Sequence, residues 1–243
     1  MLELLKIDLK NKKEYQEINK ELIEICKRSH SLKEAEEGLA KSQYMLDYPW
    51  IISHLPEITG KKILDAGGGR GVLQIYLALK GAKLHNCDRR VEHCKSWVAE
   101  KAKQFKIKIH FKDSNLMNTG YCDEAFDYIV SCSALEHNSF DDAKLVFKEL
   151  ERILKPGGLI VFTLEAWKEF KVTYGTPQDP VITCYTDKKI KELTEGTDLS
   201  LLNNENNFDQ FEDFITDILN EHPVCNRLQL MPIGVVFYKA KKL

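Results

Sequence analysis

The stretch Ile63-Leu64-Asp65-Ala66-Gly67-Gly68-Gly69-Arg70-Gly71 carries the residue types that most directly indicate chemistry. An apolar run leads into closely spaced glycines, and a helical pattern begins after them. Glycines have no Cβ and let a ligand lie against the main chain, while N–H groups at a helix start favour a negative group. Asp88 ends the next apolar run, where a carboxylate is placed to accept hydrogen bonds from ribose hydroxyls. Together these features predict a site for a nucleoside-containing cofactor.

The glycine spacing narrows the choice of cofactor. The dinucleotide fingerprint G-x-G-x-x-G, started at Gly67, requires a small residue at position 72, where the chain has Val72. Started at Gly68, it places Arg70 at the second glycine. No G-K-[ST] follows, so a Walker loop is excluded. The remaining pattern is D-x-G-x-G-x-G, and it disfavours a dinucleotide oxidoreductase.

The apolar runs that position this loop predict a parallel sheet. Short runs at 62–66, 83–87, 107–111, 126–131 and 159–164 alternate with helical patterns, which is typical of βαβ units. Further strands are expected at 199–203 and 232–240. Several runs are apolar on both faces, as strands covered by helices on both sides are. We therefore predict an α/β fold with a Rossmann-like, doubly wound, seven-stranded, mostly parallel sheet.

Three additions to this core are expected. Residues 1–60 carry helical periodicity and form an N-terminal extension, which separates them from a main domain over 61–243. Residues 166–184 have two prolines and no clear period, and are interpreted as a loop or lid. Residues 207–221 have a helical spacing of apolar residues and predict a helix inserted before the last strand. The loop and this helix are expected on the substrate side.

With these motifs in order, the sequence resembles the class I S-adenosylmethionine-dependent methyltransferases. The apolar strand, acid and glycine spacing match the first motif of that family. Lys112-Asp113-Ser114, the run from Phe126 to His137 and the turn at 152–158 match its later motifs in the same order. The resemblance is strong from about 61 to 165. It implies S-adenosylmethionine as the cofactor and S-adenosylhomocysteine as the product.

The resemblance also implies a role for each matched position. Gly67, Gly69 and Gly71 would form the loop beside the methionine part of the cofactor. Asp65 would help to hold the ammonium group, and Asp88 would hold the ribose.

The adenine and sulfonium ends of the cofactor would meet other positions. Asp113 and Ser114 would address the adenine, with Arg89 at the same edge. Ser131 and Cys132, at the end of the fourth run, would flank the methionine and the sulfonium.

Two residues are candidates for catalysis. A sulfonium methyl is already activated, so the protein mainly has to align a nucleophile and exclude water. A hydroxyl or protonated amine acceptor also needs a general base, and His137, just beyond the fourth strand, is the first candidate. Glu165, at the carboxyl end of the fifth strand, is the second. Each also has a structural interpretation, in which His137 orients its loop and Glu165 hydrogen-bonds locally.

Composition limits the partners. The 243 residues are 43% hydrophobic, and 35 basic residues nearly balance 37 acidic ones, so no global attraction to nucleic acid or to an anionic membrane is expected. No apolar run approaches the ~18 residues that span a bilayer. Seven scattered cysteines without C-x-x-C fit reduced thiols, and the histidine spacing disfavours a metal enzyme. We therefore expect a cytoplasmic protein.

The expected function is transfer of a methyl group to an oxygen or nitrogen of a small molecule. Aromatic side chains at 44–50 and 167–185 are interpreted either as an acceptor pocket or as packing. The alternatives are a methyltransferase that acts on protein or tRNA and a non-catalytic S-adenosylmethionine-binding regulator. Nucleic acid is disfavoured as a partner, and the sequence does not indicate an oligomeric state.

Overall fold

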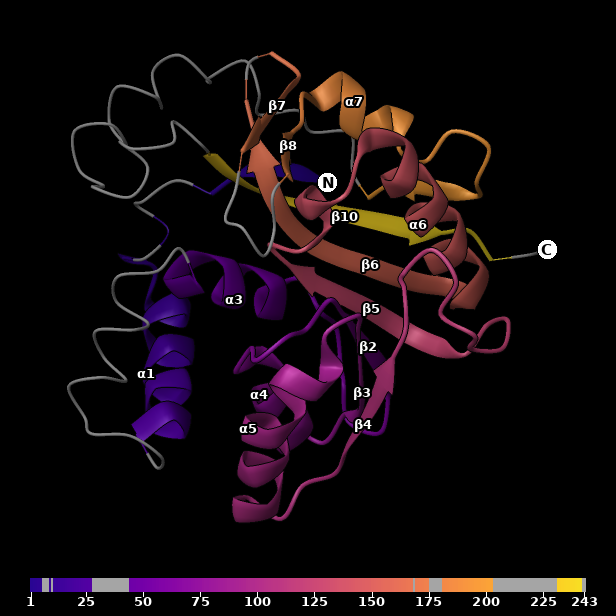
Figure 1. Cartoon of the computed structure of the whole chain (residues 1–243). Helices are drawn as coiled ribbons and strands as arrows, with labels where there is room; N and C mark the ends of the chain where they lie inside the picture. Colours follow the sequence, from indigo (N-terminus) through magenta and orange to yellow (C-terminus); the bar gives the residue numbers. More distant parts are fainter. Residues whose placement is uncertain are drawn as a thin grey trace.

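The computed structural model describes residues 1–5, 9, 11–27, 44–167, 169–174, 181–202 and 231–241 (Figure 1). Its main sheet has eight strands, in the order β1-β10-β6-β5-β2-β3-β4, with β9 also paired to β10. The strands from β2 to β6 are parallel to their neighbours, and β10 is antiparallel to β6. The order changes direction between β2 and β5, which is where open α/β sheets bind ligands. The Rossmann-like, mostly parallel sheet is therefore confirmed.

The strands in chain order are β1 (Leu2–Leu4), β2 (Lys62–Ala66), β3 (Lys83–Asp88), β4 (Ile109–Asp113), β5 (Phe126–Cys132), β6 (Leu154–Ala166), β7 (Lys171–Tyr174), β8 (Val181–Cys184), β9 (Leu199–Leu201) and β10 (Met231–Lys239). The helices are α1 (Lys13–Lys27), α3 (Tyr44–Ser53), α4 (Leu73–Leu79), α5 (Val91–Gln104), the short η2 (Leu135–His137), α6 (Phe140–Ile153) and α7 (Asp187–Glu192). No helix in these ranges is long and apolar enough to cross a membrane.

Two hydrophobic cores lie on opposite faces of the sheet. One packs against α6, α7 and η2, and the other against α1, α3, α4 and α5. Alternate residues of one strand enter different cores: Val161 of β6 joins the second, and Ile160 and Phe162 join the first. This alternation explains why the runs are apolar at consecutive positions, and it matches a sheet covered on both faces.

Helix α3 is held by contacts with α1 and with β1. Pro49 lies inside the helix and has no N–H for the carbonyl of Met45; the side-chain amide of Asn19 in α1 donates to that carbonyl at 2.9 Å. The indole N–H of Trp50 donates to Glu3 of β1 at 2.8 Å. Figure 1 shows α3 close to the end of the β5 arrow. The helix is therefore held against the carboxyl end of the sheet.

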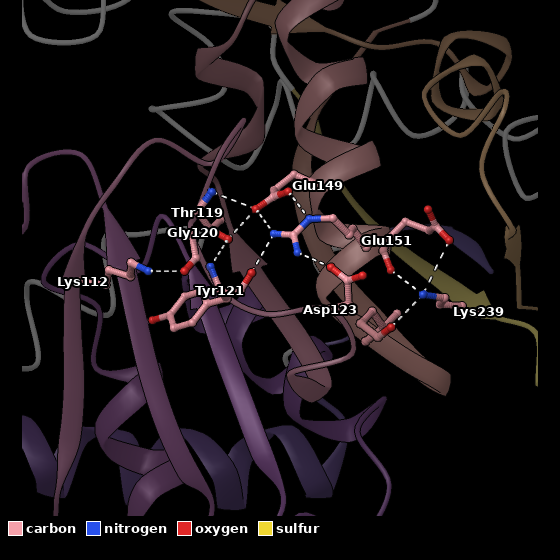
Figure 2. A network of polar contacts seen from close by, with 10 residues as sticks. Lys112, Thr119, Gly120, Tyr121, Asp123, Glu149, Glu151 and Lys239 are labelled. Carbon is pink, nitrogen blue, oxygen red and sulfur yellow. Dashed lines mark hydrogen bonds and ion pairs between the residues drawn. The ribbon is translucent and has the colours of Figure 1, made fainter.

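An ionic network fixes the connection between β4 and β5 to α6 (Figure 2). Glu149 accepts from the N–H and hydroxyl of Thr119, at 2.8 and 2.6 Å. Arg152 donates to Glu149 at 2.7 Å and to the carbonyl of Tyr121 at 2.8 Å, and it pairs with Asp123. The loop that follows the third parallel strand thus has a defined position.

Several predicted elements differ from the structure. The eighth strand, β1, comes from a region expected to be helical, because three residues are too few to show a period and pairing with β10 makes them extended. The segment predicted as a loop at 166–184 contains β7 and β8, which pair only with each other as an antiparallel ribbon. The predicted helix at 207–221 lies outside the described residues.

Candidate cofactor site

The glycine loop joins β2 to α4 at the point where the strand order changes direction. Gly67 and Gly69 have φ values of +72° and +47°, in the left-handed region that glycine adopts without steric cost. The N–H of Gly67 donates to the carbonyl of Cys87 at 2.8 Å, and that of Gly71 to the carbonyl of Gly68 at 2.9 Å. The loop is therefore a turn with a fixed backbone.

Two of the glycines are required by neighbouring protein atoms. A Cβ on Gly67 would lie 2.6 Å from the Cβ of Ala134, and a Cβ on Gly68 would lie 2.5 Å from the carboxylate of Asp65. From the sequence alone, all the glycines of the loop were expected to allow a ligand to approach the main chain. At these two positions the missing side chain also serves contact within the protein.

Two buried side-chain amides hold the loop through hydrogen bonds. The Gln74 side chain donates to the carbonyls of Gly68, Gly69 and Gly71 at 3.2, 3.2 and 3.0 Å. Asn86 of β3 donates to Gln74 at 2.9 Å and to Gly69 at 3.3 Å. Both amides are fully buried, and neither was among the predicted site residues. The sequence carried a signal for Gln74, which is a polar residue inside an otherwise apolar helix, but β3 contains several polar residues and gave no such signal for Asn86.

Asp88 faces the loop from the end of β3. One of its oxygens accepts from the N–H of Gly69 at 3.1 Å, and the other from the N–H of Arg90 at 2.7 Å. A carboxylate oxygen has two lone pairs, so each can accept a second hydrogen bond. Asp113 of β4 is the register partner of Asp88, while Arg89 is exposed. The predicted ribose acid and an acid predicted to meet adenine thus lie side by side.

Asp65 is a buried acid beneath the loop. It is 2% exposed, and burial, with the nearby charge of Asp88, raises its pKa to about 7. No lysine or arginine of the described chain is paired with it in the structure. A buried carboxylate of this kind is stabilised by a cation. The carboxylate therefore fits a ligand with a positive group at this position.

The end of β5 contacts both the loop and α3. The Ser131 hydroxyl donates to the carbonyl of Ala66 at 2.8 Å, so its hydrogen is used between strands. The Cys132 thiol donates to Asp47 of α3 at 3.8 Å and accepts from Thr163 at 3.6 Å. Burial, and then the charge of Asp47, raises the pKa of Cys132 well above its ordinary value. This thiol is protonated at neutral pH and is no nucleophile.

The two catalytic candidates lie beside β8. The His137 Nδ1 is 3.3 Å from the carbonyl of Val181, so this nitrogen must carry the hydrogen and Nε2 has the lone pair in the neutral ring. Glu165 is 7% exposed, and its carbonyl accepts from the N–H of Tyr185 at 3.0 Å.

Ser114, predicted at the adenine, donates its hydroxyl to the carbonyl of Asn118 at 2.9 Å.

Among the aromatic side chains at 44–50 and 167–185 whose burial the structure describes, three are buried. Tyr48, Trp50 and Tyr185 are 4%, 0% and 0% exposed. Phe170 is 38% exposed, and its ring meets those of Phe140 and Tyr185. Packing is thus the role of these three buried rings in the structure.

Comparison with known proteins agrees with this geometry. Residues 64–162 match the methyltransferase domain family. The chain is 31% identical, over 124 residues, to a ubiquinone biosynthesis O-methyltransferase of Haemophilus ducreyi; the match covers 47% of this chain and 50% of that protein. The chain therefore spans about half the length of this curated relative.

Solved structures share the fold over most of the chain. A 1,6-didemethyltoxoflavin-N1-methyltransferase of Burkholderia thailandensis, with 1,6-didemethyltoxoflavin and S-adenosylhomocysteine bound, has a TM-score of 0.63 at 15% identity, over 92% of this chain and 90% of that one. The [4+2]-cyclase SpnF has a TM-score of 0.62 at 17% identity, over 88% and 84%.

The strand order and the glycine loop define a Rossmann-like α/β domain, a fold shared with solved methyltransferase structures. Residues 64–162, which hold the glycine loop and Asp88, match the methyltransferase domain.

Proposed function

We propose that this chain binds S-adenosylmethionine and transfers its methyl group to an oxygen or nitrogen of a small molecule. The observation that carries the proposal is the pair formed by the glycine loop and Asp88, whose carboxylate accepts from Gly69 and retains acceptor capacity for ribose hydroxyls. Asp65 supports it, because its buried carboxylate matches the ammonium group of the cofactor. The match of residues 64–162 to a methyltransferase domain favours the same assignment.

The chemistry divides between cofactor and protein. When bound, S-adenosylmethionine would supply a methyl group already activated by its sulfonium, for transfer to the acceptor. The protein has to position the acceptor, exclude water and take up the acceptor's proton. We assign proton uptake to Nε2 of His137, with Glu165 as the second candidate. The name of the Haemophilus ducreyi relative favours oxygen as the acceptor atom.

The same proposal assigns the rest of the chain. Residues 1–60 form an N-terminal cover and residues 61–243 the methyltransferase domain, with 166–184 and 207–221 on the acceptor side. We place the protein in the cytoplasm, because its scattered cysteines fit a reducing compartment.

The test is a thermal-shift titration with S-adenosylmethionine, S-adenosylhomocysteine, NAD and NADP in parallel. At one hundred times the dissociation constant, a ligand stabilises the folded state by ~2.7 kcal/mol. We expect a shift with the two adenosyl ligands alone, followed by transfer of isotope-labelled methyl groups to a panel of phenols and amines. A shift only with NAD or NADP would contradict the cofactor. Binding without transfer to any acceptor would favour the regulatory protein.

The ribose contact has its own test. Asp88→Ala should weaken S-adenosylhomocysteine binding by ~1.5 to 3 kcal/mol, because hydrogen bonds to a charged acceptor are lost. Isothermal titration calorimetry measures the change, and Asp141→Ala, which removes an exposed acid at the start of α6, is the control. Unchanged affinity of the Asp88 variant would remove Asp88 from the site.

A further inference from the structure

Asp47 of α3 is a buried acid that neither the motifs nor the proposed chemistry use. Its side chain is fully buried and reaches the end of β5. One oxygen, Oδ2, accepts from the Ser133 hydroxyl at 3.3 Å and from the Cys132 thiol at 3.8 Å. A buried carboxylate is costly unless it is hydrogen-bonded, so these contacts are part of what keeps Asp47 at this place.

Ser133 has an unusual backbone. Its φ is +45°, a left-handed conformation that costs a residue with a side chain of the order of 1 kcal/mol or more and that glycine adopts freely. Its N–H donates to the carbonyl of Thr163 at 3.2 Å. The hydroxyl contact with Asp47 and this backbone bond therefore hold the residue in its turn.

This turn sets the position of the next residue against the glycine loop. Ala134 follows Ser133, and its Cβ lies 2.6 Å from the place of a Cβ on Gly67. If Ser133 relaxed to negative φ, Ala134 would move relative to the loop. The left-handed turn thus controls one wall of the site where β2 and β5 separate.

Helix α3 brings Asp47 to this point in a fixed position. Asn19 and Glu3 hold the helix through the contacts described above. The next residue of the helix is Tyr48, whose hydroxyl lies 3.2 Å from the place of a Cβ on Gly71. The helix therefore contacts the glycine loop and the end of β5 with consecutive residues.

We propose that Asp47 is a positioning residue: it holds Ser133 in the left-handed conformation and so shapes residues 132–134 as the wall of the site beside the methionine part of the cofactor. The inference rests on the proposed cofactor. It gives Asp47 no part in bond making, and it makes α3, which lies outside the matched domain, a requirement for tight cofactor binding.

The first experiment separates this role from general stabilisation with two variants that both lose the Ser133 hydroxyl. Ser133→Ala keeps the steric cost of positive φ, whereas Ser133→Gly removes it. By calorimetry with S-adenosylhomocysteine, we expect Ser133→Ala to bind about tenfold more weakly than Ser133→Gly. The difference corresponds to the steric cost of holding one residue with a side chain at positive φ. Equal affinities would overturn the proposal.

The second experiment removes the acid. Asp47→Ala should weaken S-adenosylhomocysteine binding by about tenfold or more, and Asp47→Asn, which keeps an acceptor oxygen, should lose less. In the Asp47→Ala background, Ser133→Gly should restore part of the affinity and Ser133→Ala should not. Asp141→Ala is the matched control, because it removes an exposed acid.

The outcomes distinguish the two proposals. Wild-type affinity in Asp47→Ala, or no rescue by glycine, would overturn the role of Asp47 and leave the proposed function in place. Absence of binding to the wild-type chain would overturn both. If Asp47→Ala does not fold, as judged by circular dichroism, the comparison of Ser133→Ala with Ser133→Gly decides the question without a change at Asp47.

Discussion

The single residue Asp65 makes the free energy of unfolding depend on pH. Its pKa is about 7 in the folded protein and 3.8 in a solvated chain, so between these values the folded state binds more protons than the unfolded state. The contribution of Asp65 to the free energy of unfolding therefore falls as pH rises from about 4 to about 7. Each pH unit in that window changes it by about 1.4 kcal/mol at most.

Asp65→Asn should remove the contribution of Asp65 to the pH dependence of the free energy of unfolding. We expect the stability of the variant relative to wild type to increase from pH 4 to pH 7 and to stay level above it, measured by urea denaturation of the ligand-free proteins. The difference between the two proteins is the quantity to follow, because other acids titrate in both. A difference that does not vary with pH would show that Asp65 titrates near its ordinary value in the folded state.

The sequence predicted the loop residues better than their supports. The glycine spacing follows from local chemistry, since glycine adopts the positive φ of positions 67 and 69 without steric cost. Gln74, Asn86 and Asp47 could not be assigned, because each acts on atoms that are distant in sequence or that only the folded turn brings within reach. A buried polar residue in an apolar pattern shows that a partner exists, and the fold decides which.

At the scale of elements, α3 depends on one glycine of β10. A Cβ on Gly234 would overlap the ring of Trp50, which is fully buried. Gly234→Ala should therefore lower the free energy of unfolding by about 1 to 3 kcal/mol through overpacking. Urea denaturation measures this loss, and Ser200→Ala, at an exposed position of β9, is the control. Equal midpoints for the two variants would mean that α3 adjusts at no cost.

The parallel strands were the elements that the sequence predicted most closely. The run predicted at 62–66 is β2 itself. The strand predicted at 107–111 is β4 at Ile109–Asp113, a shift of two residues in a boundary that sequence defines poorly. β1, β7 and β8 escaped prediction because their extended form comes from pairing and not from a period in the chain.

At the scale of the whole molecule, the two cores share one sheet. Val161 packs on one face and Phe162 on the other, and both are fully buried. Since neither core can lose the sheet without the other, we expect one cooperative unfolding transition. Phe162→Ala should cost about 3 to 5 kcal/mol and Val161→Ala less, because fewer buried atoms are removed. Far-ultraviolet circular dichroism and tryptophan fluorescence should give coincident curves for each variant, and two separate transitions would contradict this.

The edge of β10 that faces away from β6 is paired with two short strands from distant parts of the chain. β1 pairs with Ile233–Val235 and β9 with Phe237–Lys239, and Val236 between them bonds to Met1 and to Leu202. A continuous nine-residue edge would be a template on which another molecule could add a strand, and a break after three residues makes that addition unfavourable. The pairing of β10 with two short strands thus also disfavours aggregation at high concentration.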